Sequence, residues 1–80
     1  MRVRVRYFAS VREMIGLSKE EVVAPTGSTI GSLIERLMDS HEQLRHMKNL
    51  LVAVNGEFAN AEHELGDGDI VALFPPVSGG

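Results

Sequence analysis

The residues best suited to chemistry in this sequence lie at its C-terminal end. The last seven are Phe74, Pro75, Pro76, Val77, Ser78, Gly79 and Gly80. Proline fixes φ and has no N–H, so the two prolines should end a strand and keep the chain extended. From Val77 onward the tail could reach roughly 13–14 Å, at about 3.3–3.6 Å per residue. Because glycine has no Cβ, the two final residues could pass through a slot too narrow for any other residue. Such a tail suits the presentation of a C-terminal carboxylate to the active site of another protein.

The terminal carboxylate can react only with help. Its pKa is about 3.5, so at neutral pH it is ionised and is a poor electrophile. Another enzyme would have to activate Gly80, for instance by adenylation, before a sulfur or amine nucleophile could displace the nucleotide. Most C-termini have no function, however, and a Gly-Gly end can also be a cleavage scar. The rest of the sequence has to decide between these interpretations.

No other stretch of the sequence indicates a chemical site. His41 and His46 are five residues apart, whereas helical metal-binding pairs are usually four apart. The stretch 67–69 (DGD) lacks the further oxygens of a calcium loop and is interpreted as a turn. No serine has an evident base as its partner, and no glycine loop suits a phosphate. The chain has no cysteine, which excludes disulfides and thiol chemistry of its own. We expect no metal site.

Length and charge restrict the class of protein. Eighty residues make one small domain, and a net charge of −3 argues against a general nucleic-acid binder. No apolar run approaches the roughly 20 residues of a membrane span, and the alternating N-terminal residues do not resemble a signal peptide. We therefore expect a cytoplasmic domain that binds neither nucleic acid nor membranes.

The first half of the chain predicts two strands and two helices. Residues 2–8 alternate between arginine and apolar residues, which indicates a strand with one buried face and one solvated face that could also meet an acidic partner. Residues 9–15 should form a short helix with Ser10 as its N-cap and Gly16 at its end. Residues 20–24 should form an edge strand. The clearest helix follows Ser28 or Thr29, and its apolar residues are Ile30, Leu33, Ile34, Leu37 and Met38.

The second half predicts three more strands. Residues 40–48 should form a short helix or helical turn, and the apolar run 50–54 should lie centrally in the sheet. Asn55-Gly56 is a strong hairpin signal and leads into a brief strand at 57–59. A turn at 67–69 precedes the last strand, 70–74. This order predicts an α+β fold of the β-grasp (ubiquitin-like) type, with a mixed sheet wrapped around one main helix. The domain should cover residues 1–76, followed by a flexible Gly-Gly tail at 77–80.

Several motifs together resemble a known family. They are the stretch 7–16 (YFASVREMIG), the helix led by Thr29, the stretch 51–55 (LVAVN), and the stretch 65–80 (LGDGDIVALFPPVSGG). The whole chain thereby resembles the small subunits of molybdopterin synthase, within the ubiquitin-like sulfur-carrier superfamily. The ending FPPVSGG is highly specific for this branch, because other carriers share Gly-Gly but usually lack the residues that precede it here. Residues 57–64 match the family only loosely.

The resemblance implies a cycle of sulfur transfer. An E1-like enzyme would adenylate Gly80 with ATP, and a sulfur donor would convert the acyl-adenylate into a thiocarboxylate. The tail would then enter a large catalytic subunit and give its sulfur to cyclic pyranopterin monophosphate, two sulfurs making the dithiolene of molybdopterin. The family assembles as two small and two large subunits. The chain would be a non-catalytic sulfur donor without a permanently bound cofactor.

The resemblance also assigns roles to residues. Gly80 would be the acyl carrier, and Gly79 would let the tail fit its slot. The other tail residues expected to contact a partner are Phe74, Pro75, Pro76, Val77 and Ser78. Phe58 would be an exposed apolar contact for the E1-like enzyme or the large subunit, with ordinary core packing as the alternative. Arg12 could pair with an acidic partner residue.

Other functions remain compatible with the sequence. The carrier could serve thiamine, cysteine, tRNA thiolation or a tungsten-pterin cofactor. It could instead be a protein modifier joined through Gly80 to lysines of target proteins, as ubiquitin is. It could also be a plain interaction domain with an inert tail.

Overall fold

The computed structural model describes residues 1–76, and Val77, Ser78, Gly79 and Gly80 lie outside the described part. Seven helices and strands and one 3₁₀ helix follow one another along these residues. In chain order they are β1 (Arg2–Tyr7), α1 (Ala9–Ile15), β2 (Lys19–Val23), α2 (Ile30–Ser40), the 3₁₀ helix (Glu42–His46), β3 (Leu51–Val54), β4 (Glu57–Phe58) and β5 (Ile70–Phe74). This is the predicted order, with the 3₁₀ helix in place of the short helix expected at 40–48.

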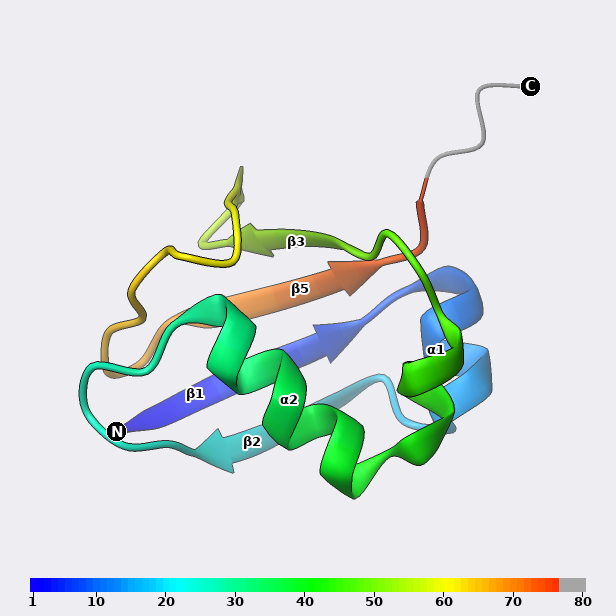
Figure 1. The fold of residues 1–80 in the computed structure, drawn as a ribbon, viewed down its shortest axis with the longest axis horizontal. Coiled ribbons are helices and arrows are strands. Elements are labelled where there is room, and N and C mark those ends of the chain that lie inside the picture. Colours follow the sequence, from blue (N-terminus) through cyan, green and yellow to red (C-terminus); the bar gives the residue numbers. More distant parts are fainter. Residues whose placement is uncertain (77–80) are drawn as a thin grey trace.

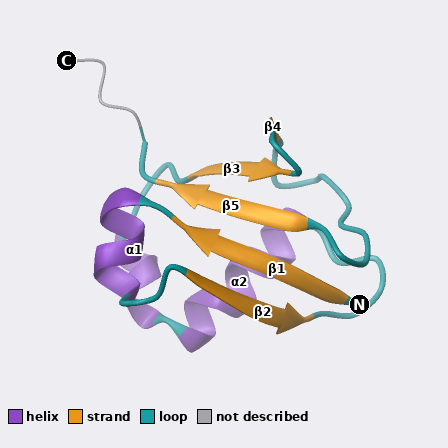
Figure 2. Ribbon diagram, turned by 180° about the vertical axis from the view of Figure 1, so that it is seen from behind, coloured by secondary structure: helices purple, strands orange, loops and turns teal. Residues whose placement is uncertain are grey.

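The five strands form one mixed sheet in the order β2-β1-β5-β3-β4 (Figure 2). β1 and β5 are parallel, while every other neighbouring pair is antiparallel. β5 is therefore the central strand, flanked by β1 and β3. The sequence analysis was wrong to place the run at 50–54 at the centre: β3 is one position from the edge, beside the two-residue strand β4. The edge position predicted for β2 is confirmed.

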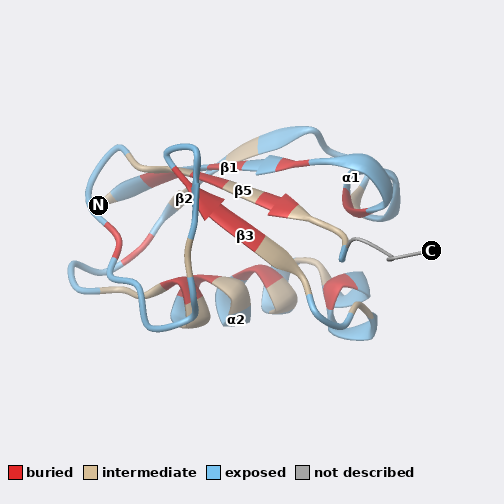
Figure 3. Ribbon diagram, turned by 90° about the horizontal axis from the view of Figure 1, so that it is seen from above, coloured by how far each residue is buried: buried red, intermediate tan, exposed pale blue. Residues whose placement is uncertain are grey.

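The core lies between the sheet and α2, which crosses one face of the sheet (Figures 1 and 3). β1 alternates strictly between exposed and buried residues, and Val3, Val5 and Tyr7 point into the core. α2 contributes the apolar stripe predicted from its periodicity, with Leu33 and Leu37 fully buried. This two-layer packing is how a sheet and a helix with one apolar face each exclude water. It is the β-grasp arrangement predicted from the order of elements.

The helix ends follow local rules, with one correction. Thr29 caps α2 in a capping box with Ser32, in which each side chain bonds the backbone N–H of the other residue. Gly16 ends α1 at φ 84°, a left-handed conformation that favours glycine. Ser10 does not cap α1 as expected: the helix has its predicted bounds, Ala9–Ile15, and Phe8 occupies the N-cap position without a side-chain hydrogen bond. Among residues 1–76, no helix is long and apolar enough to cross a membrane.

Candidate functional site

The end of β5 is the place where the chain leaves the domain. Phe74 is the last residue of the central strand, Pro75 is half-buried and Pro76 is exposed. Because proline has no N–H to donate, strand pairing stops here, as predicted. β1 runs parallel to β5 and ends beside it, where the N–H of Phe8 donates to the carbonyl of Leu73 at 3.1 Å. This geometry places the start of the C-terminal segment at one end of the sheet (Figure 1).

Three phenylalanine rings gather at this end of the sheet, and we call Phe8, Phe58 and Phe74 the aromatic patch. The rings of Phe8 and Phe74 are stacked, with centroids 4.8 Å apart and planes 12° apart. The ring of Phe58 meets Phe74 edge-on at 6.3 Å. These are all the phenylalanines of the chain, and none belongs to the buried core. An exposed aromatic cluster of this kind is typical of a protein-docking surface, because rigid rings bury much area at low entropic cost.

The β3–β4 hairpin brings Phe58 to the patch. Its turn residues Asn55 and Gly56 have φ of 51° and 89°, the left-handed pair that a tight two-residue hairpin requires. The resulting register places Phe58 opposite Ala53, on the strand that also pairs with β5. Phe58 is 74% exposed, so its side chain belongs to the surface and the alternative of core packing is wrong.

Phe8 was missed as a candidate by the sequence analysis. It continues the outward parity of Arg2, Arg4 and Arg6 on β1, and it is 37% exposed. The signal that could have found it is this parity, because an apolar residue at an outward position of a strand is not needed for the core. The outward position of Phe8 was not recognised because α1 begins at the next residue.

A polar clamp holds the start of β5 in place. The side chain of Asn55 donates to Asp69 Oδ1 at 2.9 Å and accepts from the N–H of Ile70 at 3.0 Å. Asp69 Oδ2 accepts from the N–H of Gly66 at 2.7 Å. The pKa of the Asp69 carboxyl is lowered below its ordinary value because two hydrogen bonds stabilise the carboxylate form. The bond from Gly66 has the larger effect, and the bond from Asn55 comes second. The clamp therefore connects the hairpin turn to the strand that ends in Phe74.

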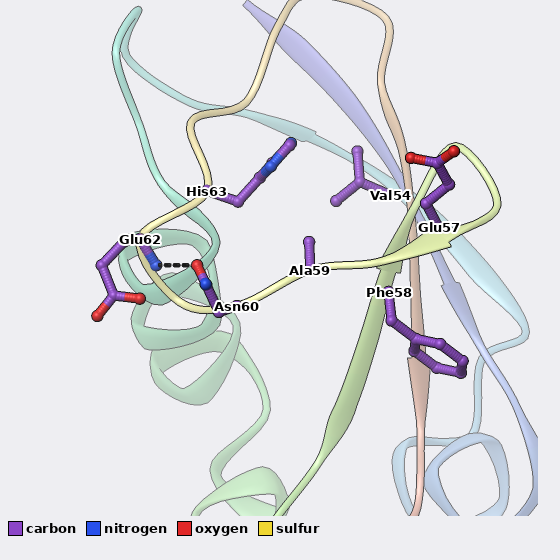
Figure 4. Close-up of a pocket in the computed structure, with 7 residues that line it drawn as sticks. All are labelled: Val54, Glu57, Phe58, Ala59, Asn60, Glu62 and His63. Atoms are coloured by element: carbon purple, nitrogen blue, oxygen red, sulfur yellow. Dashed lines mark hydrogen bonds between the residues drawn. The ribbon is translucent and has the colours of Figure 1, made fainter.

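A surface hollow of about 520 Å³ lies beside Phe58, but it lacks the features of a catalytic site. Its lining residues are Val54, Glu57, Phe58, Ala59, Asn60, Glu62 and His63. Figure 4 shows Glu57 and Glu62 at opposite sides of the hollow and the Phe58 ring turned away from it. The only hydrogen bond drawn there is local, from the N–H of Glu62 to Asn60 Oδ1 at 3.2 Å. Within residues 1–76, His63 forms no salt bridge with a carboxylate.

The histidines do not form a metal centre within residues 1–76, where no three His, Cys, Asp or Glu side chains are placed to hold an ion. His41 Nε2 lies 2.9 Å from Glu20 Oε2, and its ring meets Tyr7 edge-on at 6.0 Å. Burial, with the Glu20 carboxylate nearby, raises the pKa of the Tyr7 hydroxyl above its ordinary value. Tyr7 therefore stays neutral, and these residues connect β1 and β2 with the end of α2.

The structure brings together part of the predicted site. Phe58 and Phe74 lie in contact, and Pro75 and Pro76 follow directly. Gly80, Gly79, Ser78 and Val77 lie outside the described residues, so their roles stay predictions. Arg12 is exposed on α1, and no ion pair joins it to another residue of the described part.

The fold and the aromatic patch together define a small β-grasp protein with an exposed aromatic cluster where its last strand ends. Comparison with known proteins agrees with this class. The chain belongs to the ThiS family, whose profile matches residues 5–80.

Curated relatives match over the full chain. A molybdopterin synthase sulfur carrier subunit from Mycobacterium tuberculosis is 39% identical over 82 residues, which cover 100% of this chain and 99% of the relative. The subunit of the same name from Escherichia coli is 39% identical over 80 residues, which cover 98% and 99%.

Solved structures share the fold. A putative molybdopterin converting factor subunit 1 from Pyrococcus furiosus superposes with a TM-score of 0.90 at 35% identity, covering 96% of this chain and 99% of its own. The small archaeal modifier protein 1 of Haloferax volcanii gives a TM-score of 0.85 at 28% identity, covering 95% and 98%. A complex of subunits 1 and 2 of the molybdopterin-converting factor from Helicobacter pylori gives 0.70 at 28% identity, covering 100% of each chain.

Proposed function

We propose that this chain is the sulfur-carrier subunit of a molybdopterin synthase. The observation that carries the proposal is the full-length similarity to sulfur carrier subunits of that enzyme, at 39% identity in two bacteria. The aromatic patch supports it physically, because a carrier that presents its C-terminal segment to a partner needs a docking surface where that segment begins.

The proposed chemistry takes place at Gly80. An E1-like enzyme joins the Gly80 carboxylate to the AMP moiety of ATP and releases pyrophosphate. A sulfur donor then attacks the acyl carbon, AMP leaves, and the product is a thiocarboxylate. The thiocarboxylate sulfur then bonds to cyclic pyranopterin monophosphate, and water cleaves the bond between that sulfur and the acyl carbon, which returns Gly80 to the carboxylate. Because a dithiolene contains two sulfurs, two such transfers complete one molybdopterin.

In this cycle the chain positions the reacting group and other proteins catalyse. Gly79 allows the tail to enter a narrow slot, and Phe74 to Ser78 form the neck that the partner holds. The large catalytic subunit is the partner in an assembly of two small and two large subunits, and the relative from Helicobacter pylori supports this pairing. ATP is consumed by the activating enzyme, so the chain needs no resident cofactor. We place the cycle in the cytoplasm, without nucleic acid or membrane partners.

Tandem mass spectrometry of the C-terminal peptide tests the proposal. The protein is isolated from cells that contain its own sulfur machinery, and fragments that place sulfur on Gly80 are expected. Intact mass is not sufficient, because replacing one oxygen by sulfur changes the nominal mass as much as oxidising one of the four methionines. A control sample from cells without the activating enzyme should carry only the carboxylate. An unmodified carboxylate in the wild-type sample would contradict the proposal.

Protein modification is the second candidate function. It is favoured by the similarity to the small archaeal modifier protein 1 of Haloferax volcanii. A modifier would be found with Gly80 in an amide bond to a lysine of another protein. The same peptide spectra distinguish the two, since they show either sulfur on Gly80 or a branched peptide.

A further inference from the structure

The outer face of the sheet, opposite α2, has two chemically different halves. One half is apolar and continues the aromatic patch along β5 through the half-buried residues Ala72 and Ile70. The other half lies on β1 and β2 and is cationic. There Arg2, Arg4 and Arg6 point away from the core, as the strict alternation of β1 requires.

The arginines on β1 differ in their partners. Arg2 pairs with Glu21 on β2, with Nη1 and Oε1 3.2 Å apart. Arg4 and Arg6 form no salt bridge with any carboxylate of residues 1–76. Their guanidinium groups are exposed and available to carboxylates of another molecule, which arginine binds through its planar fork.

The register of β1 and β2 adds a third cation to this place. Lys19 lies directly opposite Arg6 in the antiparallel pair, and both residues are exposed. Like charges directly opposite each other destabilise a sheet, and no described carboxylate forms a salt bridge with either residue. We call Arg4, Arg6 and Lys19 the cationic strip. Together with Arg2 it holds four of the eight basic residues of a chain whose net charge is −3.

The strip borders a surface hollow of about 370 Å³. The lining residues are Arg4, Val5, Arg6, Lys19, Glu20 and Glu21. Of the two carboxylates in this lining, Glu20 contacts His41 on the inner side and Glu21 pairs with Arg2. Glu21 is also the register partner of Arg4. The three cations of the lining still outnumber its two carboxylates, and none of the three forms a salt bridge within residues 1–76.

The geometry points to the cationic strip as a second docking element, which receives carboxylates of the large catalytic subunit. This inference rests on the proposed function. Arg6 is the register partner of Ala72, two residues before Phe74, and neighbouring strands are about 4.8 Å apart. A partner that covers the aromatic patch therefore reaches the strip without a gap. Charge complementarity requires that the part of the partner facing β1 and β2 is acidic, beside an apolar centre.

Binding kinetics with the purified large subunit test this inference. The wild-type chain and the double variant Arg4→Glu/Arg6→Glu are compared at ionic strengths of about 0.05 M and about 0.5 M, since screening separates charge effects from apolar contacts. We expect association of the double variant to be about tenfold slower at low salt, with the two curves converging at high salt. Equal rates and equal salt dependence would overturn the inference.

A matched control separates local docking from net charge. The variant Arg45→Glu/Lys48→Glu makes the same change in net charge but alters exposed residues of the 3₁₀ helix and of the segment after it, outside β1 and β2, where Arg45 pairs with Asp39. It should associate nearly as fast as the wild type. Equal slowing of the control and the strip variant would mean that only overall charge matters, which would also overturn the inference.

A single substitution distinguishes a docking role of Lys19 from an effect on stability alone. Lys19→Glu places opposite charges at the register pair with Arg6, so the thermal midpoint should rise. The same substitution should slow association with the large subunit, because it adds a carboxylate where the partner presents its own. A lower midpoint, or association as fast as that of the wild type, would contradict the inference.

The same experiments distinguish failure of the proposed function from failure of the docking role of the cationic strip. Failure of the wild-type chain to bind the large subunit at any salt concentration would reject the proposed function. Tight wild-type binding that is unaffected by the strip variants would reject only the docking role of Arg4, Arg6 and Lys19. Salt-dependent self-association of the wild type, abolished in the strip variant, would assign the strip to a second copy of the chain and reject the large subunit as its occupant.

Discussion

At the scale of single residues, the phenylalanines of the aromatic patch differ in how much they contribute to the stability of the fold. Phe58 is 74% exposed on the two-residue strand β4, so it contributes little to the core. Phe74 is only half-exposed and packs against both other rings. The two phenylalanines should therefore respond differently to truncation, even though both contact a partner in the proposed function.

Phe58→Ala should weaken binding to the large subunit with little effect on stability. The ring is an exposed anchor, and truncating an interface hot spot typically costs about 2 kcal/mol or more of binding free energy. Isothermal titration measures the affinity, and urea unfolding measures the stability. Loss of stability equal to the loss in binding free energy would contradict the surface role of Phe58.

Phe74→Ala should weaken binding and also lower stability, by about 1–2 kcal/mol. A fully buried phenylalanine would cost about 3–5 kcal/mol, but part of this ring remains in contact with water. The remaining cost comes from its stacked contact with Phe8, whose centroid lies 4.8 Å away. The urea midpoint measures this loss, and Phe58→Ala is the matched control. An unchanged midpoint would show that the stacked pair does not stabilise the domain.

At the scale of elements, the clamp between the hairpin turn and β5 determines where the final strand begins. Asn55 and Asp69 come from different segments and bond each other and the backbone of Ile70 and Gly66. Because β5 ends in Phe74, the clamp also determines the position of the aromatic patch. Its ionic character makes it sensitive to acid.

Asp69→Asn should reduce both stability at neutral pH and the sensitivity of stability to acid. The folded pKa of Asp69 lies below the unfolded value of about 3.9, so its contribution is complete above that value. The contribution is lost as the pH falls through the folded pKa. At pH 7 we expect a loss of about 1 kcal/mol, since the carboxylate is partly solvated. Urea unfolding at several pH values measures the difference, which should shrink below pH 4 or so. A constant difference down to low pH would contradict the role of the charge.

At the scale of the whole molecule, the core and the end of the chain are separate. The buried residues lie between the sheet and α2 (Figure 3), whereas Pro75 and Pro76 follow the last strand and are half-buried and exposed. The buried residues of the described core all lie between Val3 and Leu73. We therefore expect that folding and the proposed sulfur transfer can be altered independently.

Deleting Gly80, or adding one residue after it, should abolish molybdopterin formation while the thermal midpoint stays within about 1 °C. In the proposed cycle the reacting carbon is the carboxyl carbon of Gly80, and either change moves or blocks it. The measurement is molybdopterin formed with the activating enzyme, sulfur donor and large subunit present. Ser10→Ala is a control for the effect of a surface substitution, because Ser10 caps no helix. Cofactor formation by the Gly80-deleted chain would refute the carrier role.

Local rules explain why much of the fold could be predicted from the sequence. The alternation of β1, the apolar stripe of α2 and the Asn55-Gly56 turn each depend on residues close in sequence. These patterns determined the type and order of nearly every element. They also indicated a Gly-Gly tail as the chemical feature, and this stays a prediction because residues 77–80 lie outside the described part. In α1, only the N-cap, predicted at Ser10, was wrong, because the chain turns at Phe8 and Ala9 takes a positive φ of 51° that no local pattern indicated.

The order of the strands was decided only by the tertiary structure, since pairing depends on contacts between distant segments. β5 took the central position because it pairs in parallel with β1 and antiparallel with β3. The β5 pairs, together with the β3–β4 hairpin, assembled Phe8, Phe58 and Phe74 into one patch. The pairing of β1 with β2 set Lys19 opposite Arg6. The sequence alone indicated which residues of β1 face water, because side chains alternate along a strand. Which exposed residues become neighbours followed from the register, and the register exists only once the whole sheet has formed.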